Sequence, residues 1–550
     1  MDSNGPLASA IAAFERGDLG DAREIAEKGV AADGSAQWQH LLGLIHCRAG
    51  DAQAGLPYLR VAARLEPANL DFVIILIRAL IDSGRPHEVL AMPKPVGTSR
   101  AALALWHGRA EAAAASGDAN AAVDAWNNIV SATPADARAW INLGRSLLGL
   151  NEFGQAQAAY ERALALAPDN IDAIEELGLV YERTNRLEAL RLLLDNARER
   201  GIGKDRLNFL WAVRRYREGQ IGEAGALLMQ SNPARDPIRW HRLRANIADR
   251  EGHASAAFAA SLEVNRLTKD LKRWRARASE FRRALRALAR SIACPDIPRP
   301  TLVRSSGDAS PAFIVGFPRS GTTLLDTFLM GHTSIVVLEE KEMLRRAARE
   351  LGAVWSSPAR LERARSEYLR LMAEEAGSGP GRCIIDKDPL NMLAPHLIWA
   401  MFPQSPVIFV QRHPCDVVLS CFMQSFTPNL GMASFFDLSD AADFYDASMS
   451  LWTSATAKFP LNVRTVIYED LVNDPERHLR LVIEFLGLAW EEGVLDHRST
   501  AAARGALMNT SYDQVTESLS ARAVGRWRRY EAQLKPVLPK LLPWAERLGY

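Results

Sequence analysis

A repeated pattern of small and large residues through the first half of the chain restricts its fold more than any other feature. The pattern returns at a spacing of about 34 residues. Its alanine and glycine positions let two antiparallel helices approach closely, its large residues fill the gap, and its proline ends the unit. The clearest copy consists of Trp140, Leu143, Gly144, Ala156, Tyr160, Ala163 and Pro168. Each pair leaves an apolar face that only its neighbour can cover, which predicts a stack of helix pairs.

The spacing and the residue types are those of the tetratricopeptide repeat. Weaker copies keep the same frame at Leu42, Gly43, Leu59, Ala62 and Pro67, at Trp106, Ala122, Trp126 and Pro134, at Leu177, Gly178 and Tyr181, and around residues 219–228 and 240–257. We therefore expect an all-α solenoid of about seven or eight helix pairs over residues 5–266. Such a solenoid commonly presents a surface for a protein or peptide partner. A rigid spacer is the alternative that the pattern leaves open.

A basic stretch and a proline-rich stretch follow the repeats. Residues 266–290 contain ten basic and two acidic side chains, with apolar residues roughly at helical spacing. They predict a connecting helix with one packed stripe and one solvated face, although a basic amphipathic helix could also meet a membrane surface or an acidic partner. The stretch from Cys294 to Pro311 contains four prolines, counting Pro311. We therefore place a connecting helix and linker at residues 267–311.

After the linker the pattern changes to that of an α/β domain, expected over residues 312–550. Four short apolar runs are typical of buried parallel strands, and each precedes a polar turn and a helical stretch. These runs are residues 313–316, 383–385, 407–411 and 463–467. They predict a central parallel sheet covered by helices.

Composition narrows the expected partners and setting. The 550 residues carry a net charge of +1, which gives no reason to expect a nucleic-acid partner or a membrane surface. No apolar run is long enough to cross a bilayer. The five cysteines lack the paired short spacing of a zinc site or a redox motif. These features predict a cytoplasmic protein with no membrane span and no metal.

The first chemical motif follows the first expected strand and opens a helix. Gly316 and Gly321 have the spacing of a Walker A phosphate loop, but Thr322 stands where that loop has its lysine. A strand, a glycine turn and a helix N-terminus together form an anion site. Arg319 and the hydroxyls of Thr322 and Thr323 can supply further donors. This P-loop-like turn suits a single phosphate better than an Mg-bridged triphosphate, which argues against the alternative of a nucleotide kinase.

The second motif reads VIFVQRHPCDVVLSCF and starts at the third apolar run. Arg412 ends the expected strand, and Ser420 lies about two turns into the following helix. An arginine leaving a strand can bind a phosphate through two hydrogen bonds, and the serine can fold back toward the same anion. The pairing is informative because it follows the glycine loop in one domain.

On these motifs the C-terminal part, residues 312–550, resembles sulfotransferases that use 3′-phosphoadenosine 5′-phosphosulfate (PAPS), most of all the tyrosylprotein sulfotransferase family. The whole chain is similar to bacterial proteins that join tetratricopeptide repeats to such a domain. The resemblance implies that the loop Arg319, Ser320, Gly321, Thr322 and Thr323 holds the 5′-phosphosulfate. It also implies that Arg412 and Ser420 hold the 3′-phosphate.

Further residues take their expected roles from the same resemblance. GHTSIVVLEE places the family's catalytic glutamate at Glu340, and DKDPL places its lysine at Lys387. The late segments place Tyr468, Ser511 and Arg526 at nucleotide-binding positions. Transfer of a sulfuryl group to a hydroxyl needs a base for the acceptor proton and cations for the leaving charge, and these residues supply both.

Physical reasoning supports these roles independently, with some alternatives left open. Glu340 would act as base, Lys387 and Arg319 would lie beside the transferring group, and Ser511 would be an additional donor, by analogy with phosphoryl transfer. Glu339 or Glu342 could instead be the base. His332 is expected to be a structural turn residue.

The sequence thus predicts a PAPS-dependent sulfotransferase that acts without metal on a hydroxyl acceptor. The favoured acceptor is a protein or peptide tyrosine recruited by the repeats. A glycan or a small-molecule acceptor stays open, as does a repeat scaffold with a weakly active or inactive nucleotide-binding domain. The oligomeric state, including a homodimer, is also open.

Overall fold

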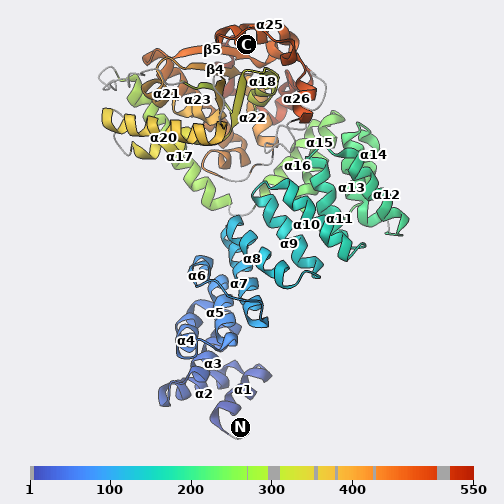
Figure 1. Cartoon of the computed structure of the whole chain (residues 1–550), viewed down its shortest axis with the longest axis vertical. Helices are drawn as coiled ribbons and strands as arrows, with labels where there is room; N and C mark the ends of the chain where they lie inside the picture. The colour runs from blue at the N-terminus through green and yellow to red at the C-terminus, as the bar shows by residue number, and fades with distance from the viewer. Residues whose placement is uncertain are drawn as a thin grey trace. The chain divides into compact units, whose positions relative to one another are not determined.

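The structure is a computed structural model that describes residues 5–202, 204–268, 271–294, 310–351, 357–377, 382–424, 426, 429–503 and 521–550. The chain divides into two compact units, Met1–Leu210 and Trp211–Tyr550 (Figure 1). Across these described residues, no helix is both long and apolar enough to cross a membrane.

The described residues of the first unit form helices joined by turns and short loops, and consecutive helices pack as pairs. Its helices are α1 (Pro6–Arg16), α2 (Leu19–Ala32), α3 (Ala36–Arg48), α4 (Ala52–Leu65), α5 (Leu70–Asp82), α6 (Pro86–Ala91), α7 (Arg100–Ser116), α8 (Ala119–Ala132), α9 (Ala137–Gly149), α10 (Phe153–Leu166), α11 (Ile171–Arg183) and α12 (Leu187–Glu199). Helix α13 (Lys204–Arg217) contains the division between the units. The all-α solenoid expected from the repeat is confirmed.

Close approach at the glycine positions explains the repeat pattern. A Cβ at Gly144 would lie 2.6 Å from Cε1 of Tyr160, and one at Gly43 would lie 2.5 Å from Cγ of Leu59. The large partner thus occupies the space that the glycine leaves, and any side chain there would force the paired helices apart. The spacing of small and large residues in the sequence therefore follows from the close packing of the paired helices.

The second unit begins with helices that resemble the repeats and continues into a sheet domain. Its first helices are α14 (Ile221–Met229), α15 (Pro237–Arg250), α16 (Ala254–Leu267) and α17 (Leu271–Ala293). Ala257 of α16 and Leu285 of α17 belong to the same buried cluster as Phe313 and Phe409 of the sheet. Helices α16 and α17, the last two before the sheet, therefore share a hydrophobic core with it.

The basic helix α17 packs on an acidic face of α23 (Leu438–Lys458). The buried Arg282 contacts Asp440 at 2.6 Å and the hydroxyl of Ser434 at 2.9 Å. Arg275 and Arg286 pair with further aspartates of the same face, Asp437, Asp443 and Asp446. The acidic partner that a basic amphipathic helix can meet is here a helix of the same chain.

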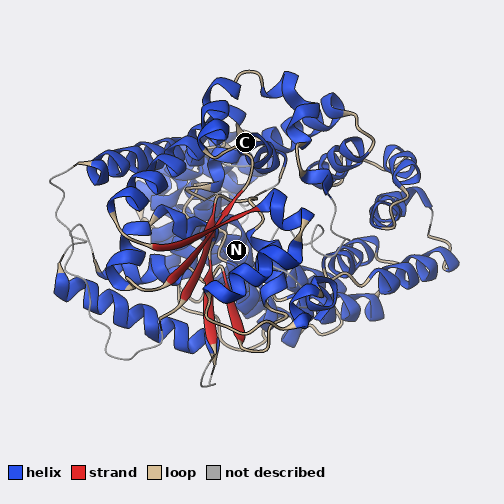
Figure 2. Ribbon diagram, turned by 90° about the horizontal axis from the view of Figure 1, so that it is seen from above, coloured by secondary structure: helices blue, strands red, loops and turns tan. Residues whose placement is uncertain are grey.

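Five parallel strands form the sheet in the order β2-β3-β1-β4-β5 (Figure 2). They are β1 (Ala312–Gly316), β2 (Ile335–Glu339), β3 (Cys383–Lys387), β4 (Pro406–Gln411) and β5 (Asn462–Ile467). The predicted parallel sheet is confirmed, with β2 as an additional edge strand. From β1 the chain crosses to the edge strand β2, returns through β3 beside β1, and then continues on the other side of β1 with β4 and β5. In such sheets ligands bind at the carboxyl ends of the strands, where the strand order switches from one side to the other.

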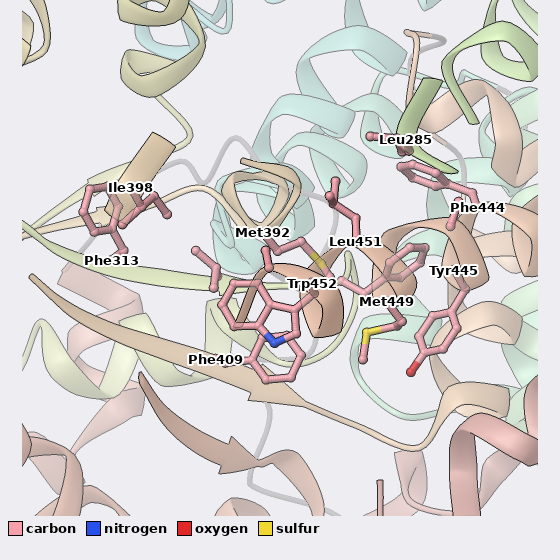
Figure 3. Packing of buried hydrophobic residues seen from close by; sticks show 14 of the residues in the cluster. Leu285, Phe313, Met392, Ile398, Phe409, Phe444, Tyr445, Met449, Leu451 and Trp452 are labelled. Atoms are coloured by element: carbon pink, nitrogen blue, oxygen red, sulfur yellow. The ribbon is translucent and has the colours of Figure 1, made fainter. Parts of the chain in front are cut away.

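Helices cover both faces of the sheet. They are α18 (Thr322–Leu329), α19 (Met343–Ala347), α20 (Pro358–Ala376), α21 (Pro395–Met401), α22 (Pro414–Met423), α23, α24 (Tyr468–Asn473), α25 (Pro475–Phe485), α26 (His497–Ala503), α28 (Glu531–Leu534) and α29 (Leu538–Arg547). Alternation along β1 sends Phe313 to one core and Ile314 to the other. In the first core, Phe409 stacks on Trp452 with ring centroids 4.6 Å apart (Figure 3). Both faces are thus sealed, which leaves the carboxyl edge as the place for polar chemistry.

Candidate active site at the carboxyl edge of the sheet

The glycine loop after β1 turns sharply into α18 through two left-handed residues. Arg319 has φ of 71° and Gly321 has φ of 108°. A Cβ at Gly321 would lie 2.4 Å from Cδ2 of Tyr468, so the ring packs directly on the loop backbone. Ser320 is buried, and its hydroxyl has no hydrogen-bond partner among the described residues. Backbone N–H groups at the start of α18 and this hydroxyl are donors suited to an anion.

Arg412 leaves the end of β4 and reaches the glycine loop. Its Nη1 donates to the backbone carbonyl of Arg319 at 2.9 Å, and its Nη2 donates to the carbonyl of Ala523 at 2.7 Å. Its guanidinium lies 4.5 Å from the ring centroid of Tyr468, while its buried Nε has no partner within the part of the chain that the structure describes. The loop and the strand-end arginine thus form one continuous surface.

The two predicted anion motifs meet through the loop arginine. Nε of Arg319 donates to Oγ of Ser420 on α22 at 3.1 Å, so the structure brings Arg319, Arg412 and Ser420 together. Burial lowers the pKa of Arg319 to about 10, and the nearby positive charges of Arg412 and Arg526 act in the same direction. Three guanidinium groups that repel one another in a buried place would be stabilised by a bound anion.

Arg526 joins this group from the last part of the chain. Its Nε contacts Oδ1 of Asp249 at 3.1 Å, and its Nη2 lies 3.2 Å from the sulfur of Met423. Asp416 of α22 accepts from the backbone N–H groups of Gly525 and Trp527, both at 2.7 Å. The residues on either side of Arg526 are therefore fixed to α22. Ser511, the remaining predicted donor, lies outside the described residues.

Lys387 lies at the end of β3, on the other side of β1. It is fully buried, and its Nζ contacts three carboxylates: Glu340 at 2.9 Å, Glu339 at 3.1 Å and Asp326 at 3.4 Å. Burial alone would lower the pKa of Lys387, but these three negative charges outweigh it and raise the pKa above its usual value. Lys387 is therefore a permanent cation held at the site by acidic neighbours.

Glu340 follows directly on β2 in a left-handed conformation. Its φ is 50°, and its N–H donates to the carbonyl of Lys387 at 2.8 Å. Its side chain is 47% exposed, compared with 18% for Glu339. Glu342 has a similar φ of 54° but pairs with Arg345 at 2.6 Å. Among these three carboxylates, Glu340 alone combines contact with Lys387 and a side chain that is largely open to solvent.

Two comparisons of sequence now identify the parts of the chain. Residues 311–492 match the Sulfotransferase family, and residues 137–170 match the tetratricopeptide repeat. The C-terminal part carries a sulfotransferase domain. A chicken (Gallus gallus) protein-tyrosine sulfotransferase 2 is 24% identical over 43% of this chain and 68% of its own length.

Other similar proteins cover different shares of the chain. An uncharacterised protein of Aquifex aeolicus is 27% identical over 51% of this chain, which spans only 38% of that relative's length. The solved sulfotransferase domain of the Synechococcus PCC 7002 olefin synthase is 21% identical, with a TM-score of 0.31, over 46% of this chain and 99% of its own.

The sulfotransferase domain also contains site residues that the sequence did not indicate. Asp326 is completely buried in the middle of α18, a helix whose residues are all buried, and it contacts Lys387. Asp386 accepts from the hydroxyl of Tyr368 at 2.8 Å and from Nδ2 of Asn391 at 3.3 Å, and burial raises its pKa to about 7. A single acid among the threonines, leucines and phenylalanine of α18 is a usable sequence signal for Asp326. Asp386 offers no sequence signal beyond its place next to Lys387.

His332 has a structural role at the turn before β2. Its ring is buried, its Nδ1 accepts from the N–H of Ser334 at 3.1 Å, and its Nε2 lies 2.8 Å from the carbonyl of Ala489. Because Nδ1 accepts, Nε2 carries the proton and donates to that carbonyl. Both nitrogens are thus engaged in holding the turn. The described residues contain no group of three or more metal-ligating side chains placed to hold an ion.

Proposed function

We propose that the protein transfers the sulfuryl group of PAPS to a hydroxyl acceptor, most favourably a protein or peptide tyrosine that the repeats recruit. The observation that carries this proposal is the contact of 2.9 Å between Glu340 and the buried Lys387, beside the glycine loop. It places a solvent-accessible carboxylate and a permanent cation where strand ends and loop converge. The named activity of the chicken relative, protein-tyrosine sulfotransferase 2, supports the choice of acceptor.

The arginine side of the site would hold the nucleotide. The start of α18, with Thr322 and Thr323, and the hydroxyl of Ser320 would bind the 5′-phosphosulfate, which supplies the sulfuryl group and leaves as a phosphate. Arg412 and Ser420 would bind the 3′-phosphate. Nε of Arg412 and Oγ of Ser320 in the glycine loop are buried and have no partner among the described residues, and they fit this assignment because buried donors call for an acceptor.

The lysine side would perform the proton and charge transfers. A carboxylate oxygen of Glu340 would accept the proton of the acceptor hydroxyl while the oxygen of that hydroxyl attacks sulfur. The ammonium group of Lys387, together with Arg319, would stabilise the negative charge that develops on the transferring group and on the departing phosphate oxygen. Asp326 and Glu339 would keep Lys387 charged while Glu340 changes its protonation. Ser511 and Tyr468 would complete the nucleotide contacts, and no metal ion is required.

Labelled PAPS tests the reaction and the acceptor together. The full-length protein is incubated with labelled PAPS and an extract of the host cells, and mass spectrometry locates the label. We expect it on tyrosine side chains of proteins. Label on a glycan or a small molecule would refute the tyrosine assignment and keep the sulfotransferase. Absence of any transferred label, with binding of adenosine 3′,5′-bisphosphate intact, would favour a repeat scaffold with an inactive domain.

A further inference from the structure

Asp249, near the end of α15, reaches from the repeat-like helices into the last part of the sulfotransferase domain. Its Oδ1 contacts Nε of Arg526 at 3.1 Å and accepts from the hydroxyl of Tyr530 at 2.6 Å. Arg529 contacts both the carboxylate at 3.4 Å and the backbone carbonyl of Asp249 at 3.1 Å. One partly buried carboxylate therefore gathers three side chains from a single turn, 277 to 281 residues away in sequence.

The contact leaves most of the Arg526 guanidinium available. A guanidinium has five N–H donors, and Asp249 engages the one at Nε. One N–H of Nη2 donates to the sulfur of Met423 on α22 at 3.2 Å, and the other donors stay available. Asp416, Ser420 and Met423 are spaced at helical intervals and share one face of α22. Arg526 therefore lies along the face of α22 that carries Ser420, and its Nη2 is directed toward that face.

The helix that carries Ser420 is also supported from the same side. Phe258 of α16 stacks on Phe422 with ring centroids 4.8 Å apart, and Nδ2 of Asn265 donates to the carbonyl of Phe422 at 3.4 Å. Gln533 contacts Ser255 of α16 at 3.0 Å. The helix pair α15–α16 thus touches both α22 and the turn that bears Arg526.

We infer that Asp249 is a positioning residue for the 3′-phosphate of the nucleotide, so that the last repeat-like helix pair completes the donor site. The inference rests on the proposed function. Asp249 orients Arg526 through Nε, and Arg526 then adds its charge to that of Arg412 beside Ser420. An arginine at this place without Asp249 would lose much of its side-chain order, and with it the directed hydrogen bonds to a phosphate.

Calorimetry on the full-length protein separates this role from a merely structural one. Asp249→Asn should weaken adenosine 3′,5′-bisphosphate about 5- to 30-fold, and adenosine 5′-monophosphate, which lacks the 3′-phosphate, should bind within about twofold of wild type. Asp249→Glu keeps the charge but displaces the guanidinium, and it should weaken bisphosphate binding in the same way. This variant is used in place of Asp249→Asn if Asp249→Asn does not fold. Glu251→Gln, at the end of the same helix, should bind both nucleotides as wild type does.

A second variant shows whether the effect passes through Arg526. In an Arg526→Gln background, Asp249→Asn should cause no further loss of bisphosphate affinity. Equal losses for both nucleotides, unchanged bisphosphate affinity, or additive effects in the double variant would each overturn the inference. If the wild-type protein itself bound both nucleotides equally, the donor assignment would fail and the inference with it. If wild type preferred the bisphosphate and Asp249→Asn kept that preference, only the inference would fail.

Discussion

The two sides of the candidate site handle charge in opposite ways. On the side of β4, Nε of Arg319 donates to a serine hydroxyl, and Arg412 donates to two backbone carbonyls. On the side of β2 and β3, the single ammonium of Lys387 contacts three carboxylates. Arg412 therefore offers its positive charge to a ligand, whereas the charge of Lys387 is compensated by three carboxylates of the protein.

This difference separates binding from chemistry. A doubly charged phosphate gains most at a cation such as Arg412, whose hydrogen bonds go to carbonyl oxygens, because it then replaces neutral contacts with charged ones. A carboxylate works best as a proton acceptor where other carboxylates still neutralise the neighbouring cation after it is protonated. Asp326 and Glu339 would do this for Lys387 when Glu340 takes up a proton. Substitutions on the two sides should therefore change different measured quantities, nucleotide affinity on one and turnover on the other.

Loss of the base should have the largest effect. Glu340→Ala should lower kcat by about 10²- to 10⁴-fold, the usual contribution of a general base, and bisphosphate affinity should stay near wild type. Glu340→Gln should be almost as slow, because the amide keeps the shape but accepts no proton. Steady-state kinetics with the acceptor that the labelling experiment identifies measures kcat, and calorimetry measures bisphosphate affinity.

The matched control for this prediction is Glu342→Ala. Glu342 has nearly the same backbone conformation and side-chain exposure as Glu340, 50% against 47%, but it pairs with Arg345. Its removal should leave kcat close to wild type. A Glu340→Ala protein with wild-type turnover would show that the base lies elsewhere, and Glu339 would be tested next.

Loss of the lysine should rank second. Lys387→Met should lower kcat by about 10²- to 10³-fold, since a cation at the transferring group is lost, while nucleotide affinity changes little. Acceptors of graded hydroxyl pKa distinguish the two defects: the Glu340→Ala deficit should shrink as the acceptor becomes more acidic, and the Lys387→Met deficit should not. Lys341→Met, which removes an exposed lysine paired with Glu375 at 2.7 Å, serves as the control. Equal shrinkage in both variants would contradict separate roles.

On the arginine side the expected change is in affinity. Arg412→Ala should weaken adenosine 3′,5′-bisphosphate about 10- to 100-fold, measured by calorimetry with EDTA present because the proposed site uses no metal. Arg480→Ala is the control, since Arg480 also lies over an aromatic ring, 4.2 Å from the centroid of Trp490, but away from the strand ends. Tight Mg-ATP binding by the wild-type protein, without affinity for the bisphosphate, would contradict the assignment.

The smallest catalytic effect is expected at Asp386, whose side chain alternates away from Lys387 along β3. Burial raises its pKa to about 7 from 3.8. The folded protein thus keeps this proton between about pH 4 and pH 7 while the unfolded chain has lost it, so stability falls as pH rises through this range and levels off above it. Asp386→Asn should remove this slope, with kcat within about threefold of wild type.

Thermal unfolding between pH 4 and pH 8 measures this slope. The Tm of Asp386→Asn relative to wild type should rise with pH by about 3–10 °C. Glu362→Gln, an exposed acid on the same helix as Tyr368, should follow the wild-type curve. Parallel curves for Asp386→Asn and wild type would show that Asp386 is already ionised at low pH.

The repeats and most of the sheet could be predicted because their signals are local. Close contacts such as Gly144 with Tyr160 impose a spacing that the sequence displays directly. The apolar runs at 313–316 and 407–411 lie within β1 and β4. The edge strand β2 was not predicted, because its short run was interpreted only as the segment before Glu340.

The site could be predicted in its parts but not in its pairing. Each motif follows the carboxyl end of a strand, and parallel strands bring such ends to one edge, which is why the loop, Arg412 and Lys387 converge. The sequence indicates neither that Arg319 contacts Ser420 nor that three carboxylates surround Lys387. Asp249 lies 277 residues from Arg526, and no periodicity or motif links residues so far apart.

The docking of α17 on α23 also sets an order of events during synthesis. Arg282 and its partner Asp440 are separated by 158 residues. At about 5–20 residues per second, roughly 8–30 s pass between the emergence of the two helices from the ribosome. Throughout that interval a long cationic helix with an uncovered apolar stripe is without its partner. The nascent chain therefore has a built-in waiting period in which a chaperone has a natural place to bind.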